Sequence, residues 1–69
     1  MRLKKRRVRV HLKDNAPSID GLLVGCVDGH YLLKVARVVK NAEETISLNG
    51  DVEVPRANVL FLQRLGVSA

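Results

Sequence analysis

Residues 50–65, GDVEVPRANVLFLQRL, contain the pattern that decides the fold. Val52 and Val54 alternate with acidic residues, which is typical of a strand with one buried side and one solvent-facing side. After the insert 55–58, the run 59–62 is apolar at every position and therefore on both faces. A chain of 69 residues has little interior in which to bury both faces of a strand. The pattern therefore predicts that another chain, most simply a second copy, covers the outer face by strand addition.

The N-terminal half of the chain predicts further strands. Residues 7–13 alternate strictly, with Val8, Val10 and Leu12 on one side and basic side chains on the other, which indicates a half-buried strand with a basic outer face. Residues 14–18, DNAPS, predict a turn. In the following segment 19–39, Asp28-Gly29 between two apolar runs predicts a tight hairpin, because such turns need positive φ angles.

Two glycines, Gly21 and Gly25, interrupt the first strand of that hairpin and predict a sharp bend or bulge. Residues 40–50 form a connection whose centre fits either a continued strand pair or a loop. The total is five short strands, and an open sheet of this size would leave one face bare. We therefore expect an all-β fold, a small, strongly bent five-stranded barrel over residues 7–65. Residues 1–6 are a basic arm or a short first helical turn, and 66–69 are a tail.

The charge of the chain is concentrated at one end. The net charge is +5, but residues 1–13 carry seven bases and no acid, whereas the remaining residues carry five bases and seven acids. Such a polycationic segment favours phosphate backbones, acidic lipid surfaces or acidic protein patches. The alternative is a solvated arm that keeps the protein soluble. Base stacking has few candidates, because Tyr31 and Phe61 are the only aromatic residues.

Catalysis, metal binding and cofactor binding find little support in the residue pattern. The single cysteine, Cys26, cannot form an internal disulfide or a cysteine-rich zinc site, and its apolar neighbours predict a small buried hydrophobe. The two histidines fall on different elements, and no serine has the context of a nucleophile. No apolar run approaches the ~20 residues of a membrane span. We expect a cytoplasmic protein that is not an enzyme, with no cofactor and no membrane contact.

Two segments resemble the motifs of the Sm/Lsm family. The segment 19–36 is similar to the first motif, with Gly21, Leu23 and Asp28 in place and Val35 at the family's leucine position. The segment 48–62 is similar to the second motif, and the matching residues are Gly50, Val52, Val54, Asn58, Val59 and Leu62. The resemblance implies an SH3-like (Sm-like) barrel that assembles into a homo-oligomeric ring of six or seven subunits, in which the strand after the insert pairs with the neighbour. It also implies RNA as a ligand.

The departures from the family fall on its RNA-reading positions. Leu32 stands where the first motif has a base-reading asparagine, and Pro55, Arg56 and Ala57 replace the Arg-Gly-Asp/Asn run of the second motif. The spacing from Gly21 to Asp28 is one residue longer than in the family. His30 occupies a position that the family often uses for base stacking.

These observations yield two sets of candidate residues. The predicted RNA-binding residues are Lys4, Lys5, Arg6, Arg7, His30, Tyr31, Arg56 and Asn58. The predicted oligomer interface consists of Val52, Val54, Val59, Leu60, Phe61 and Leu62. Structural alternatives stay open: the Tyr31 ring packs in the barrel, His30 is a turn residue, Arg56 bonds loop carbonyls, and Asn58 bonds its own turn.

Two functions remain. The first is an Sm-like homo-oligomeric ring that binds RNA through its basic N-terminal segment and the turn residues. The second is a protein-interaction or structural scaffold of SH3 type that binds a protein and no RNA, such as a viral or mobile-element accessory protein. Neutralising the basic arm should abolish binding in the first case and leave partner binding in the second.

Overall fold

The computed structural model describes residues 6–65 and contains six strands and one short 3-10 helix. The all-β prediction is confirmed for these residues. The elements are β1 (Arg6–Leu12), β2 (Ser18–Val27), β3 (His30–Asn41), β4 (Glu44–Ser47), β5 (Val52–Pro55), η1 (Arg56–Asn58) and β6 (Val59–Arg64).

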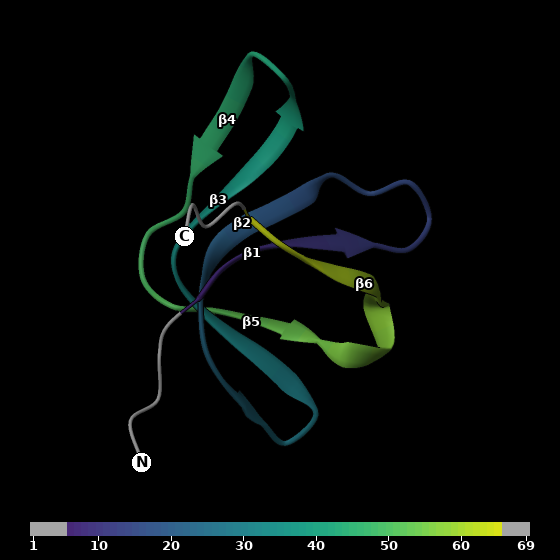
Figure 1. Ribbon diagram of the computed structural model, residues 1–69, viewed down its shortest axis with the longest axis vertical. Coiled ribbons are helices and arrows are strands. Elements are labelled where there is room, and N and C mark those ends of the chain that lie inside the picture. Colours follow the sequence, from purple (N-terminus) through teal and green to yellow (C-terminus); the bar gives the residue numbers. More distant parts are fainter. Residues whose placement is uncertain (1–5, 66–69) are drawn as a thin grey trace.

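The strands form one antiparallel sheet with the order β4-β3-β2-β1-β6, and β5 pairs with β3 off this path (Figure 1). The sheet has six strands instead of the expected five, because part of the connection 40–50 forms β4. The expected barrel closure is absent from the ladders of residues 6–65, since β5 pairs with β3 and β6 pairs with β1. The predicted N-terminal helical turn lies outside the described residues, except that Arg6 already begins β1.

Two tight turns set the register of the first three strands. Asp14 and Asn15 have φ angles of 62° and 58°, and Asp28 and Gly29 have 49° and 76°. Positive φ at both central residues is the geometry of the two-residue hairpin turn, so the predicted Asp28-Gly29 hairpin is confirmed. The first turn places Arg9 opposite Asp20.

The predicted bends in β2 are also present. The β2–β3 register shifts between Leu23 and Gly25 and again between Asp20 and Leu22. At the second shift the one extra residue lies on β3, where Val35 has a φ of 51°. Gly21 faces this point, and a Cβ there would come within 3.3 Å of Ala36.

This bulge divides β3 into two parts that pair with different strands. Residues before it pair with β5, and residues after it pair with β4. A bulge bends its strand and increases the local twist, which is how one strand can serve two diverging parts of a sheet. In Figure 1 the β3–β4 hairpin accordingly projects away from the β1–β6 pair.

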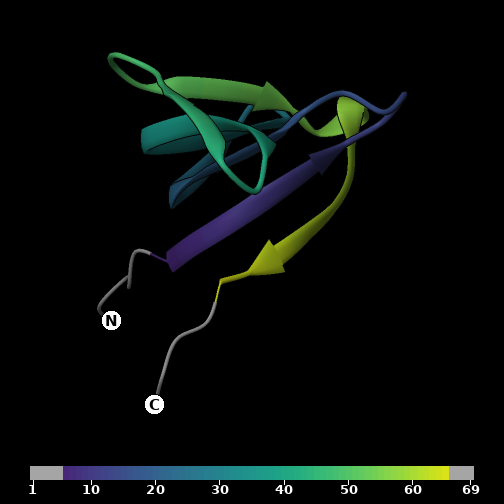
Figure 2. The same cartoon turned by 90° about the horizontal axis from the view of Figure 1, so that it is seen from above.

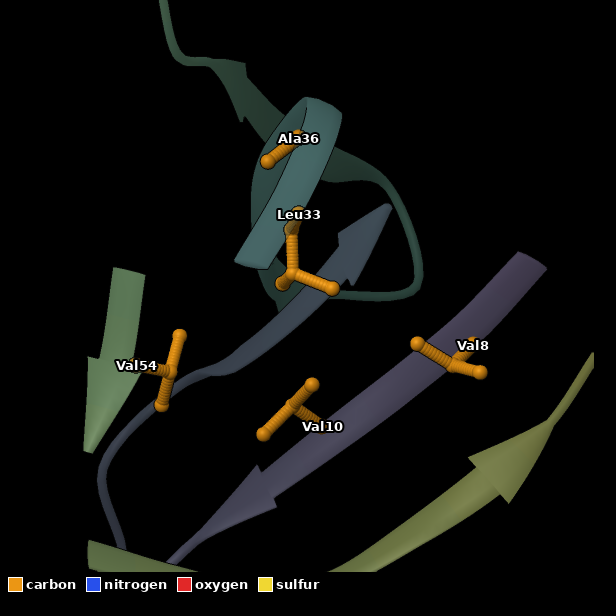
Figure 3. Packing of buried hydrophobic residues seen from close by; sticks show 5 residues of the cluster. All are labelled: Val8, Val10, Leu33, Ala36 and Val54. Carbon is orange, nitrogen blue, oxygen red and sulfur yellow. The ribbon is translucent and has the colours of Figure 1, made fainter. Parts of the chain in front are cut away.

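A small apolar core fills the concave side of the bent sheet. Its fully or nearly fully buried members come from β1, β3 and β5, and Figure 3 shows their side chains converging: Val8, Val10, Leu33, Ala36 and Val54. Seven partly buried residues surround them: Leu12, Ile19, Leu23, Leu48, Val52, Val59 and Leu62. The inward side of β1 is the one that its alternation predicts.

Candidate nucleic-acid interface

The turn before β3 and the insert after β5 come together at one corner of the sheet. The β3–β5 ladder aligns His30 with Pro55. Pro55 ends β5 with a φ of −60°, and the chain then enters η1. The backbone amide of Arg56 donates a 2.9 Å hydrogen bond to the carbonyl oxygen of Gly29. The insert is therefore fastened to the Asp28-Gly29 turn, which fixes where its side chains emerge.

This corner carries three predicted RNA-binding residues, and the side chains of two of them, Tyr31 and Arg56, lie near each other. The guanidinium carbon of Arg56 lies 6.0 Å from the centroid of the Tyr31 ring, at the outer limit of a cation–π contact. His30 precedes Tyr31, and its Nδ1 lies 3.0 Å from the carbonyl oxygen of Asp28. Because a carbonyl oxygen only accepts, Nδ1 must donate, and this bond holds the imidazole against the turn. We name His30, Tyr31 and Arg56 the corner cluster.

Asn58 lies at the far end of η1 from Arg56. Its carbonyl oxygen accepts a 2.9 Å hydrogen bond from the amide of Lys13. This bond ties the insert to the end of β1 as well as to the Asp28-Gly29 turn. Asn58 thus has a structural contact through its backbone.

The described basic residues at the start of β1, Arg6 and Arg7, are not part of the corner cluster. Lys4 and Lys5 lie outside the described residues. Arg6 and Arg7 begin β1, and both are exposed. Arg7 lines a hollow beside the β3 bulge together with Val35 and Arg37.

The predicted interface residues divide into core and surface. Val54 is 4% exposed and belongs to the core, and Val52, Val59 and Leu62 pack against that core. Leu60 and Phe61 are 62% and 51% exposed. Within a single chain, therefore, Leu60 and Phe61 remain as apolar surface on β6, which forms one end of the sheet path.

The structure also shows a buried ion pair that the sequence reasoning missed. Asp20 is 2% exposed. Arg9 donates two hydrogen bonds to its carboxylate, from Nε to Oδ1 at 2.7 Å and from Nη2 to Oδ2 at 3.0 Å. The hydrogen bonds from Arg9 lower the pKa of Asp20, and the nearby charges of Arg37 and Arg7 act in the same direction. The same bond raises the pKa of Arg9. The Asp14-Asn15 turn could have revealed this pair, because a two-residue turn there makes Arg9 and Asp20 direct neighbours.

Further findings bear on other kinds of site. Residues 6–65 contain no helix long and apolar enough to cross a membrane. Within the same range, no three histidine, cysteine, aspartate or glutamate side chains are grouped so that they could hold a metal ion. Cys26 is exposed, whereas the sequence predicted burial; it lies near the end of β2, next to the hairpin turn.

Comparisons with protein-family models, with curated proteins and with solved structures find no match to this chain. The functional argument accordingly depends on the geometry of its own residues.

Proposed function

We propose that this protein is a non-catalytic RNA-binding module that works as a homo-oligomeric ring, with its bent six-stranded sheet as an open variant of the Sm-like, SH3-type fold. The corner cluster is the observation that carries the proposal. The Tyr31 ring and the Arg56 guanidinium lie near each other at the Asp28-Gly29 turn, the His30 imidazole is held against the same turn, and each of these groups can stack on a base. The arginine can also contact a phosphate, which gives the cluster both halves of a nucleotide-binding site.

The ends of the sheet support the assembly part of the proposal. The path β4-β3-β2-β1-β6 leaves β4 and β6 each with one unpaired side. All four residues of β4 are exposed, and Ile46 within it is 45% exposed. Head-to-tail pairing of β4 from one copy with β6 of the next is a heterologous contact, which closes into a ring when the rotation permits. The exposed side chain of Leu60 on β6 would then be covered by the neighbouring copy.

Ring symmetry would amplify a weak site. Each corner cluster offers only a few contacts, but identical clusters repeated around a ring bind one strand with combined avidity. The basic N-terminal segment would add phosphate contacts and make the binding strongly dependent on salt.

Native mass spectrometry of protein purified gently, without nuclease, tests the proposal. We expect a closed oligomer that carries additional mass, and nuclease treatment should remove that mass. The double variant Tyr31→Leu/Arg56→Gln should keep the oligomer and lose most of the bound RNA. A clean monomer would refute the ring, and a variant that retains its RNA would refute the role of the corner cluster.

The same oligomer without nucleic acid would favour the second function, a protein-interaction scaffold. The exposed apolar residues on β4 and β6 give that alternative its support, because such edges also pair with strands of other proteins.

A further inference from the structure

A second surface lies on the convex side of the sheet, away from the core. Directly opposed residues of antiparallel strands project from the same face. Arg37, Asp20, Arg9 and Gln63 form one such row across β3, β2, β1 and β6, and the next outward row contains Val39, Ser18, His11 and Phe61. We name this side the outer face.

The outer face concentrates positive charge in a hollow. Arg9, Arg37 and Lys40 line a depression of about 520 Å³, a size within the ordinary range for ligand sites. Asp20 is the only acidic residue in its lining, and Arg9 already neutralises it. Arg37 also lines the neighbouring hollow with Arg7, so the positive surface continues toward the start of β1.

An aromatic pair stands beside this hollow. Phe61 stacks on His11 with ring centroids 4.3 Å apart and an angle of 21° between the planes. Nε2 of His11 lies 2.8 Å from Oε1 of Gln63, and its Nδ1 lies 3.4 Å from Oγ of Ser18. These contacts hold the imidazole from both sides. Phe61 nevertheless remains 51% exposed, which leaves ring surface for another planar group.

The combination points to one class of ligand. Arginine and lysine side chains alone would suit any polyanion, including an acidic peptide or an anionic membrane. The half-exposed Phe61–His11 pair lies two residues beyond Arg9 along β1 and adds a fixed surface on which a planar base can stack. Single-stranded nucleic acid is the polyanion that uses both features, because it presents phosphates and unpaired bases in alternation.

We propose that the outer face is a second binding surface for single-stranded nucleic acid, separate from the corner cluster. Phosphates bind in the hollow at Arg37 and Lys40, and a base stacks on the Phe61–His11 pair. Arg9 positions the surface by holding Asp20. The inference shares with the proposed function only the class of ligand, since neither Tyr31 nor Arg56 takes part in it.

Fluorescence anisotropy with a labelled oligouridylate of about twelve nucleotides tests the surface in the 69-residue chain over a range of salt concentrations. The first variant is Arg37→Gln/Lys40→Gln, whose side chains are exposed and form no hydrogen bond within residues 6–65. The second is Phe61→Leu, which removes the ring and keeps an apolar side chain. The matched control, Lys34→Gln/Arg64→Gln, removes two exposed charges that line neither hollow and lie outside the basic N-terminal segment.

We expect Arg37→Gln/Lys40→Gln to make the slope of log K against log salt shallower by about 1.4, since each phosphate contact on a single strand contributes about 0.7. Phe61→Leu should weaken binding about tenfold with an unchanged slope, because stacking adds affinity without releasing ions. The control should leave the slope unchanged.

Several outcomes would overturn the inference. Equal slopes for the charge variant and its control would show that the hollow holds no phosphate, and undiminished binding by Phe61→Leu would remove the platform. Equally tight, Arg37-dependent binding of polyglutamate or anionic vesicles would show a general anion surface. If only Tyr31→Leu/Arg56→Gln loses binding, this inference fails and the proposed function stands. If only the outer-face variants lose binding, the corner cluster fails and the outer face stands.

Discussion

Val35 occupies the most strained backbone position of the described chain, and replacing it with glycine should stabilise the protein. Its φ of 51° is left-handed, a conformation that costs an L-residue about 1–2 kcal/mol, most for β-branched side chains. Glycine removes that cost but loses about 0.5–1 kcal/mol of backbone entropy. Val35 is 76% exposed, so losing its side chain costs only about 0.5 kcal/mol more. With the strain of this β-branched residue at the upper value of about 2 kcal/mol, Val35→Gly should gain at least about 0.5 kcal/mol.

Val27→Gly is the matched control, because Val27 is also a largely exposed strand valine but has a negative φ. It relieves no strain and should lose about 1.5 kcal/mol from glycine entropy and lost burial. Urea and thermal unfolding, both at one fixed protein concentration, should thus separate the two variants by about 2 kcal/mol, or roughly 10 °C in Tm. If Val35→Gly destabilises the protein as much as Val27→Gly does, the bulge stores no strain.

The ion pair and the core give three more predictions. Arg9→Ala should cost about 2–3 kcal/mol, more than Asp20→Asn, because it leaves a buried carboxylate without its partner; urea titrations of both variants check the order. The pKa of Asp20 is lowered from its usual 3.8, so the free energy of unfolding should fall as the pH drops through the carboxyl range. Asp20→Asn should make this fall smaller. A free energy of unfolding that rises on acidification would contradict the prediction. Gly21→Ala should cost about 1–3 kcal/mol in thermal unfolding, since the new methyl group would meet Ala36 at 3.3 Å, and a neutral result would show that β3 can move.

Local sequence rules predicted the strands and the tight turns well. Alternation identified β1, and Asp28-Gly29 identified the hairpin, because both signals depend only on neighbouring residues. The glycines correctly marked the bends in β2. They did not reveal the compensating bulge on β3, since a valine, which normally avoids positive φ, carries it.

The candidate sites show a similar division. The grouping of Tyr31 with Arg56 was predicted through a family resemblance, and the β3–β5 ladder provides its physical basis. The outer face was missed because it needs the register of four strands at once. Phe61 was assigned to an interface from its apolar neighbours alone, whereas its position opposite His11 depends on a β-bulge between His11 and Leu12.

The pairing of β1 with β6 has a consequence for how the protein is made. Val8 lies opposite Arg64, and the amide of Leu65 donates a 3.0 Å hydrogen bond to Arg7, so the first and last strands of the domain lie side by side (Figure 2). The ribosome synthesises β1 first and β6 last. One side of β1 therefore has no partner until β6 has been translated, and the sheet can be completed only after that point. Such sequence-distant pairing slows folding, so the nascent domain passes through a period in which an unpaired strand is open to wrong partners.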